Sequence, residues 1–340
     1  MSSASWPRVA VVGAGAVGGY FGGMLARAGA RVTLIGRPVH VDVWTREGLF
    51  VDSVNFQESI PVAASTELAA AGDADLVLFC VKTLDTEETA RQLARHVRGD
   101  TLIVSLQNGV DNVERMRAAV ALDPIAAAVY VASSMPGPGR IKHGGRGDLL
   151  IGDLPGRSDS RRDAAVARVA AWFEAAGVPC RISPGIEVDL WIKLITNVAL
   201  NAISAVAHAT YGEIVAIPES RETVRQLVNE CVAVARTGGV VLPEIDFVQM
   251  VWSFAEKFDR VYSSTAQDLE RGKRTEIDTL NGFVVRRGAD LKVPTPVNQA
   301  LFALVKLREA DFLREAASQA PVSGVTGGTI PLDSFGSART

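Results

Sequence analysis

The segment "RVAVVGAGAVGG" at residues 8–19 decides the fold of this 340-residue chain. A run of β-branched residues leads directly into three glycines with the spacing G-x-G-x-x-G, and a helical pattern follows. In this setting the glycines allow a tight turn and a close approach of the backbone to a pyrophosphate, which a helix N-terminus then faces. The segment therefore predicts a dinucleotide site at the first strand, formed by Gly13, Ala14, Gly15, Ala16, Val17 and Gly18.

The second strand, "RVTLIG" at residues 31–36, is followed by Arg37. An NAD enzyme usually has an acid at this point to bind the ribose 2′-hydroxyl, whereas a guanidinium suits a 2′-phosphate. Arg37 therefore predicts NADP(H) as the cofactor. The alternative is that Arg37 is an exposed turn residue without a ligand.

Further strands are expected at "DLVLFCV" (75–81) and "TLIVSL" (101–106), with helices between several of the strands. This alternation is typical of a parallel Rossmann-type sheet. The glycine-rich segment at residues 126–153 is expected to extend the sheet with antiparallel strands. Lys82 and Asn108 follow strand ends, where ligands of such sheets bind, so both are expected at the crevice. Either could instead be a helix-entry or turn residue, and Asn108-Gly109 is a plausible turn pair.

The chain changes character at "SPG" (183–185), after which helical apolar spacing dominates. We therefore expect an NADP-binding domain at residues 1–184, an all-α domain at 185–318 whose last helix ends near Phe312, and a disordered tail at 319–340 that is rich in Gly, Ser, Thr and Pro. Because the boundary contains Pro-Gly, it is also a candidate hinge for domain closure.

Composition limits the partners of the protein. A net charge of -3 gives no general attraction to nucleic acid or an anionic membrane, and no apolar run is long enough to span a bilayer. Three cysteines without short spacing, and a start without the features of a secretory leader, favour a soluble cytoplasmic protein. We expect a small-molecule substrate and no metal site. The apolar segment "FVQMVWSFAEKF" (247–258) could be a core helix or a subunit interface, and we expect it in the core. The sequence does not give the oligomeric state, and a homodimer stays possible.

In the helical part, "LWIKLITNVALN" (190–201) places Lys193, Asn197 and Asn201 at i, i+4 and i+8. A buried lysine can donate a proton to a carbonyl oxygen, and the amides can hold a substrate without adding charge. The alternative is a solvated polar stripe. Further on, Ser264 and Glu276 lie in "YSSTAQDLERGKRTEIDTLNG" (262–282), where Glu276 is expected to begin a helix; alone, it reads as an acid that complements the helix dipole.

These motifs together resemble the ketopantoate reductase (2-dehydropantoate 2-reductase) family. Order and spacing agree from Val9 to Lys306 through "GAGAVG", the arginine after the second strand, "VK", "QNG", "LWIKLITNVALNAISA" and "RGKRTEIDTLNG". The resemblance implies a helical domain like the C-terminal domain of 6-phosphogluconate dehydrogenase. It also implies NADPH-dependent reduction of 2-dehydropantoate to (R)-pantoate for pantothenate and coenzyme A biosynthesis.

The resemblance further implies a role for each candidate residue. Lys193 would be the general acid and Glu276 would bind the substrate hydroxyl, while Asn197, Asn201 and Ser264 would hold the hydroxyl and carboxylate. Asn108 would contact both cofactor and substrate, Lys82 would line the cofactor cleft, and Arg37 would bind the 2′-phosphate. Two alternatives remain: a related reductase of another 2-oxoacid, and a non-catalytic NADP-binding regulator.

Overall fold

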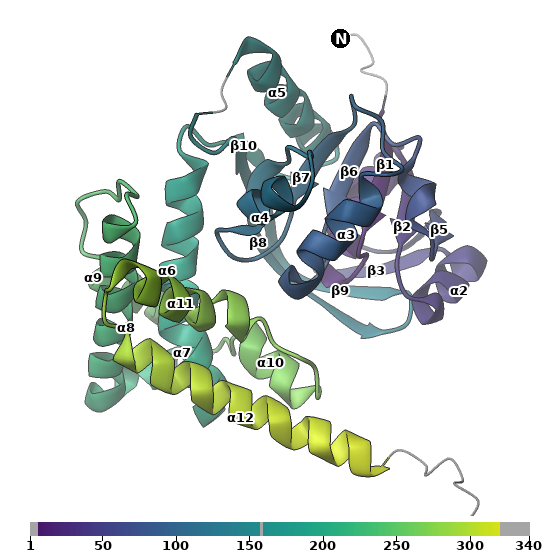
Figure 1. The fold of residues 1–340 in the computed structure, drawn as a ribbon. Coiled ribbons are helices and arrows are strands. Elements are labelled where there is room, and N and C mark those ends of the chain that lie inside the picture. Colours follow the sequence, from purple (N-terminus) through teal and green to yellow (C-terminus); the bar gives the residue numbers. More distant parts are fainter. Residues whose placement is uncertain (1–5, 157–158, 320–340) are drawn as a thin grey trace, which may run out of the picture.

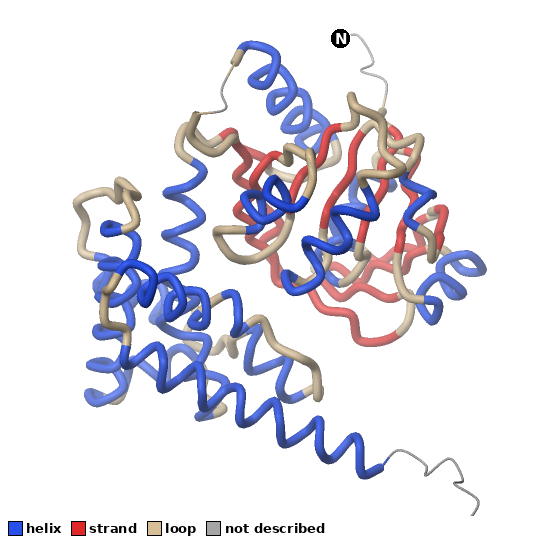
Figure 2. Tube along the Cα trace, in the orientation of Figure 1, coloured by secondary structure: helices blue, strands red, loops and turns tan. Residues whose placement is uncertain are grey.

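The computed structural model describes residues 6–156 and 159–319, with side chains up to residue 311. The chain forms two lobes, one of strands with covering helices and one of helices alone (Figures 1 and 2). The first lobe is a Rossmann-like domain and the second is an all-α domain, as the sequence predicts. The disordered tail expected at 319–340 lies outside the described residues, apart from Gln319, which ends a helix.

Within the described residues, ten strands form one mixed sheet in the order β4-β3-β9-β8-β7-β6-β1-β2-β5, with β10 paired to β9. Strands β5, β2, β1, β6, β7 and β8 run parallel, and β9 returns antiparallel to β8. The bounds are β1 Arg8–Val12, β2 Arg31–Ile35, β3 Leu49–Ser53, β4 Gln57–Ile60, β5 Ala63–Ser65, β6 Leu76–Phe79, β7 Leu102–Ser105, β8 Ile125–Gly137, β9 Arg140–Gly152 and β10 Cys180–Ile182.

The expected antiparallel extension is confirmed as the long hairpin β8–β9. Strands β3, β4 and β5 were not predicted. They are three to five residues long, and only β3 alternates buried with half-buried positions throughout. Their sequence pattern is therefore too short to separate a strand from a loop.

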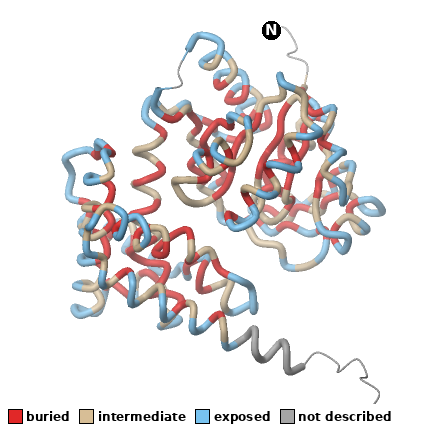
Figure 3. Tube along the Cα trace, in the orientation of Figure 1, coloured by how far each residue is buried: buried red, intermediate tan, exposed pale blue. Residues whose placement is uncertain are grey.

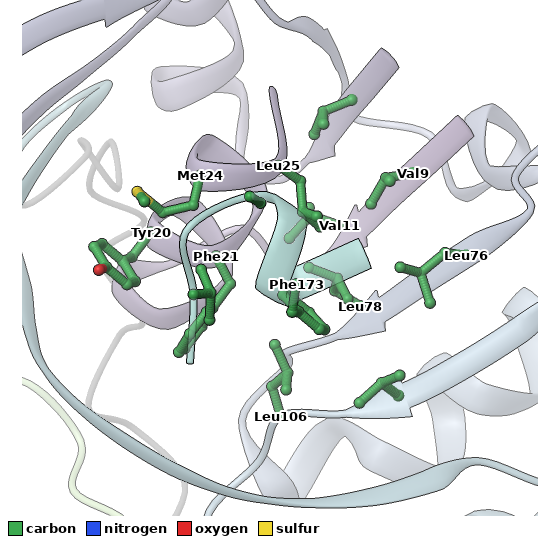
Figure 4. Close-up of a cluster of buried hydrophobic side chains, with 14 of the residues drawn as sticks. Val9, Val11, Tyr20, Phe21, Met24, Leu25, Leu76, Leu78, Leu106 and Phe173 are labelled. Atoms are coloured by element: carbon green, nitrogen blue, oxygen red, sulfur yellow. The ribbon is translucent and has the colours of Figure 1, made fainter. Parts of the chain in front are cut away.

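Five α-helices cover the sheet: α1 Ala16–Arg27, α2 Pro38–Glu47, α3 Thr86–Leu93, α4 Asn112–Ala119 and α5 Ser160–Ala175. Short 3₁₀ turns lie at η1 Leu68–Ala71 and η2 Thr83–Asp85. Phe21 of α1 meets Phe173 of α5 edge to face, with ring centroids 6.1 Å apart, above the strand side chains Val11 and Leu78 (Figure 4). This core fixes α1, and with it the glycine turn, on the sheet.

The helical lobe contains α6 Ile186–Ala207, α7 Tyr211–Ala216, α8 Pro218–Thr237, α9 Phe247–Lys257, α10 Ser264–Glu270, η3 Ile277–Thr279, α11 Asn281–Leu291 and α12 Pro296–Gln319. The α9 residues Phe247, Val251 and Ala255 pack in its core, as expected. Figure 3 shows the buried parts of these helices turned toward one another.

Two boundaries in this lobe differ from expectation. The last helix does not end near Phe312 but continues to Gln319, because good helix formers persist up to Pro321 in the sequence. Glu276 does not begin an α-helix. It precedes the 3₁₀ turn η3, since Leu280 (φ -104°, ψ -104°) lies outside the helical region and delays α11 to Asn281.

Helix α6 connects the lobes. Its first turns belong to the sheet lobe, where Ile186 and Leu190 pack against Val113 and Ala126, and its later turns enter the helical core from Trp191 onward. By length and composition α6 could cross a membrane, but 61% of its most apolar window is buried within the fold. Its apolar character is therefore accounted for by packing against two cores.

Candidate active site

The glycine turn joins β1 to α1 at the carboxyl end of the sheet. Gly13 has φ +78°, and a Cβ atom there would lie 2.8 Å from the backbone of Val81, so the turn is tight and pressed against the neighbouring loop. Gly18 packs on β1, where an added Cβ would come within 2.7 Å of Val11. These are the turn and helix-packing roles of the first and third glycines in a dinucleotide-binding motif.

The second glycine leaves space in front of the helix. Gly15 is the N-cap of α1, and no side chain caps the helix there. The nearest atom to a Cβ built on Gly15 is the Gly13 carbonyl oxygen at 3.8 Å. The unsatisfied N–H groups of the first turn, in Ala16, Val17 and Gly18, thus face an open approach, which fits a pyrophosphate.

Arg37 lies at the end of β2, exposed, at the N-cap of α2. Its Nη2 lies 3.2 Å from Nε2 of His40, whose ring stacks on Trp44. Burial, together with the charges of Arg37 and Lys273, lowers the pKa of His40. A neutral imidazole can then accept the Arg37 hydrogen bond and hold the guanidinium beside the end of β2.

A chain of hydrogen bonds links the two lobes at Lys193, Asn108 and Glu276. The Lys193 Nζ donates to Oδ1 of Asn108 at 2.7 Å, and Nδ2 of Asn108 donates to Oε2 of Glu276 at 2.8 Å. Asn108 follows β7, whereas the other two residues come from α6 and the turn before η3. The structure thus brings together three of the predicted site residues, and Glu276 bonds across the cleft instead of capping its own helix.

Lys82 lies beside this chain. Its Nζ is 3.4 Å from Oε1 of Glu276 and 3.6 Å from Oδ2 of Asp268. Burial lowers the pKa of Lys82, but the attraction of the two carboxylates outweighs this and the pKa is raised. Lys82 therefore stays charged and balances two acids at the cleft.

Asp268 was not predicted from the sequence. It lies on α10, one helical turn after Ser264, and burial raises the pKa of its carboxyl despite the nearby Lys82. The i, i+4 spacing from Ser264 is the one signal that could have identified it.

Burial has the opposite effect on Lys193. Loss of hydration lowers the pKa of its ammonium from 10.5 to about 8. The Glu276 carboxylate counteracts this shift, while the guanidinium of Arg146 adds to it. A lysine with a pKa near 8 releases a proton much more readily than a surface lysine.

The other predicted residues are placed differently. Asn197 is half-buried on α6, one turn beyond Lys193. Asn201 is 2% exposed; its Oδ1 accepts from the Tyr211 hydroxyl at 3.3 Å and its carbonyl accepts from Ser263. Ser264 is exposed at the start of α10. The structure does not link these three residues to the Lys193–Asn108–Glu276 chain by a hydrogen bond among its described contacts.

Helix α12 supports Glu276 from behind. Glu309, 3% exposed, accepts from the Thr275 backbone N–H at 2.7 Å, and Lys306 bridges Asp278 and Glu309 at 2.9 and 2.7 Å. The residues on both sides of Glu276 are therefore fixed to one helix. Sequence reasoning missed this support because it joins segments about thirty residues apart.

The chain is similar to known proteins over most of its length. Residues 9–156 match the family described as Ketopantoate reductase PanE/ApbA, and residues 185–309 match its C-terminal domain. The chain is 33% identical over 307 residues to a 2-dehydropantoate 2-reductase of Halobacterium salinarum, a match that covers 89% of this chain and 99% of the relative.

Solved structures show the same likeness. A PanE/ApbA family ketopantoate reductase from Ralstonia eutropha JMP134 is 46% identical with a TM-score of 0.84, covering 90% of this chain and 99% of that one. A D-mandelate dehydrogenase solved with NADH and anilino(oxo)acetate is 25% identical with a TM-score of 0.81, covering 90% and 99%. The two lobes and the cleft between them therefore have the architecture of nicotinamide-dependent reductases, and the chain belongs to the ketopantoate reductase family of oxidoreductases.

Proposed function

We propose that the protein reduces 2-dehydropantoate to (R)-pantoate with NADPH, a step of pantothenate and coenzyme A biosynthesis. The observation that carries this proposal is the hydrogen-bond chain from Lys193 through Asn108 to Glu276. A lysine of lowered pKa and a carboxylate are joined through Asn108 at the carboxyl end of the parallel strands, the edge of the sheet to which the glycine turn and Arg37 also belong. A regulator that only binds the cofactor has no need of such a lysine.

The cofactor contacts follow from the sheet lobe. Gly13, Gly15 and Gly18 would admit the pyrophosphate, and Arg37 would bind the 2′-phosphate with His40 behind it. Asn108 and Lys82 would lie on the nicotinamide side of the cleft. The bound nicotinamide supplies the hydride, from its C4 atom, that the C2 carbon of the substrate accepts.

Lys193 would supply the proton. As the C2 carbonyl accepts the hydride, negative charge develops on its oxygen, and the Lys193 ammonium donates its proton there. The product has a new C–H and O–H bond, and the neutral amine regains a proton from water. Glu276 would accept a hydrogen bond from the substrate hydroxyl, and Asn197, Asn201 and Ser264 would complete substrate binding.

A second candidate function keeps the mechanism and changes the substrate. The neighbour D-mandelate dehydrogenase, solved with NADH and anilino(oxo)acetate, has the same fold at 25% identity. Its existence favours testing other 2-oxoacids and both nicotinamide cofactors. The absence of an acid at the end of β2, where Arg37 stands, supports NADPH for this chain.

The test is an assay of NADPH oxidation with 2-dehydropantoate and a panel of other 2-oxoacids, repeated with NADH. We expect turnover of 2-dehydropantoate and a preference for NADPH that Arg37→Ala reduces by roughly 10- to 100-fold, the effect of a hydrogen bond to a charged group. Turnover of a different acid alone would assign the second candidate. Tight NADPH binding without turnover of any 2-oxoacid would support the alternative that the protein is a non-catalytic NADP-binding regulator.

For the remaining properties, the three free cysteines support a reducing cytoplasmic location. We propose a small-molecule 2-oxoacid as the partner, without nucleic acid or membrane; a homodimer is compatible with this function.

A further inference from the structure

The hairpin β8–β9 contains an unusual turn of backbone beside the site. Arg146 has φ +54° and lies between Gly145 (φ +137°) and Gly147 (φ +131°). The strand register shifts here, between Tyr130 and Val131. A bulky residue with positive φ is rare and costs free energy, and such residues concentrate at functional sites.

Buried groups hold this conformation in place. His143, 3% exposed, lies 2.6 Å from the Arg146 carbonyl through Nε2 and 2.9 Å from Ser53 Oγ through Nδ1. Because a carbonyl only accepts, Nε2 is the donor. The His143 ring stacks on Tyr20, and the Tyr20 hydroxyl fills the space where a Cβ on Gly147 would be, at 2.5 Å. The turn is therefore fixed independently of the Arg146 side chain.

The Arg146 and Lys193 side chains both lie against the ring of Tyr130. Its Cζ lies 4.3 Å from the centroid of the Tyr130 ring, and Lys193 Nζ lies 5.6 Å from the same centroid. Asp148 accepts from Nε at 3.0 Å and from Nη2 at 2.7 Å, which leaves Nη1 without a bond to Asp148. The side chain of Arg146 is 44% exposed, so this edge can reach a ligand.

The cations beside Glu276 are Lys82 and Arg274, and the pocket that they line also contains the carboxylates of Glu276 and Asp278. Glu276 and Asp268 are negative groups on one side, and Lys82 is shared between them. In a 2-oxoacid the carboxylate is bonded to the same carbon that carries the oxygen to be protonated, so it must lie close to Lys193. Arg146 shares the Tyr130 ring with Lys193, and a guanidinium edge matches a carboxylate.

We propose that Arg146 binds the carboxylate of the 2-oxoacid, with Tyr130 as the platform that holds the guanidinium beside Lys193. This inference rests on the proposed function and assigns a specificity residue to it. It makes the hairpin a third part of the substrate site, in addition to α6 and the segment that contains Glu276. It also gives the strained backbone at Arg146 a role, since the turn fixes where the guanidinium begins.

The test compares an acid with its neutral ester. Arg146→Gln and Arg146→Lys are assayed with 2-dehydropantoate, or the best acid of the panel, and with its methyl ester. Arg140→Gln is the matched control, because Arg140 lies on the same hairpin and stacks on Phe50 at 4.2 Å. Binding of the acid to the enzyme–NADP⁺ complex is measured by calorimetry, which does not depend on turnover.

We expect Arg146→Gln to raise KM and Kd for the acid by roughly 10- to 100-fold, with little change for the ester, for kcat or for NADPH binding. Arg146→Lys should restore part of the affinity, and Arg140→Gln should behave like the wild type. Equal losses for acid and ester, or no loss, would overturn the inference while the wild-type activity still supports the proposed function. A wild-type protein that neither binds nor reduces any 2-oxoacid would overturn both.

Discussion

Lys193 on the helical lobe and Asn108 on the sheet lobe meet through a 2.7 Å hydrogen bond, although 85 residues separate them in the chain. The bond places the ammonium at the carboxyl end of β7, where a Rossmann-like domain binds its ligand. The amide oxygen of Asn108 orients the ammonium but carries no full negative charge. A carboxylate in its place would raise the pKa of Lys193 and make proton donation harder.

Replacing Lys193 by Met removes the proposed proton donor while preserving most of the side-chain volume. We expect kcat to fall by about 10²- to 10⁴-fold, the usual contribution of general acid catalysis. NADPH affinity should stay the same, and the unfolding midpoint should be unchanged or higher because a buried charge is lost. The exposed Lys257→Met is the control. A loss of kcat below tenfold would argue against the role.

The pH dependence of kcat/KM should report the pKa of Lys193. The general acid must be protonated in the free enzyme, and burial brings its pKa to about 8. Activity is therefore expected on the acid side of pH 8 and should fall tenfold per pH unit well above it. A limb near the ordinary lysine pKa of 10.5 would contradict the burial effect. The limb should be missing from the residual rate of Lys193→Met.

Glu276→Gln keeps an oxygen that can accept from Asn108 but removes the charge. Since the Glu276 carboxylate raises the pKa of Lys193, its neutralisation should move the alkaline limb of kcat/KM below pH 8. KM for the substrate should rise roughly tenfold or more, because a hydrogen bond to a charged group is lost. Glu270→Gln, an exposed acid on α10, provides the comparison. An unmoved limb would show that Glu276 and Lys193 are not coupled.

Substitutions at Gly13 and Gly15 should affect different properties: the first should lower stability and the second should weaken cofactor binding. Gly13→Ala forces a Cβ into a φ of +78° and against Val81, so we expect a loss of at least about 1 kcal/mol in the free energy of unfolding. Gly15→Ala meets no close atom and should unfold like the wild type, yet bind NADPH at least about tenfold more weakly because its Cβ occupies the pyrophosphate approach. Thermal denaturation and NADPH fluorescence titration measure the two effects. Tight NADPH binding by Gly15→Ala would place the pyrophosphate elsewhere.

The sequence predicted the parts of this structure that repeat with a regular period. The alternation of strands and helices, the hairpin β8–β9 and the apolar face of α6 follow from local patterns. Arg146 and Glu309 could not be found in this way, because their importance comes from contacts between segments that are distant in the chain. Asp268 had only its i, i+4 spacing from Ser264 as a local signal, and its contact with Lys82 joins the two lobes. The Asn108–Glu276 bond, for example, spans 168 residues.

The spacing i, i+4, i+8 of Lys193, Asn197 and Asn201 does not put all three side chains on the same side of α6. Successive residues of an α-helix turn by 100°, so a residue eight positions on lies about 80° around the axis from the first. Lys193 can therefore face the cleft while Asn201 faces the helical core, where it accepts from Tyr211. Asn197, in between, is the better placed of the two for a substrate.

Helix α6 is a continuous element that belongs to both lobes. Its start at Ile186 is embedded in the sheet lobe, so the segment 183–185 cannot by itself be the pivot between the lobes. Leu190 packs in the sheet-lobe core and Trp191 in the helical core, so any relative motion of the lobes must bend α6 near this junction. Lys193 lies less than one helical turn beyond this junction, on the side of the helical lobe. A closing motion would thus shift the proton donor itself, and hydrogen exchange at Lys193 that differs with and without NADPH would reveal it.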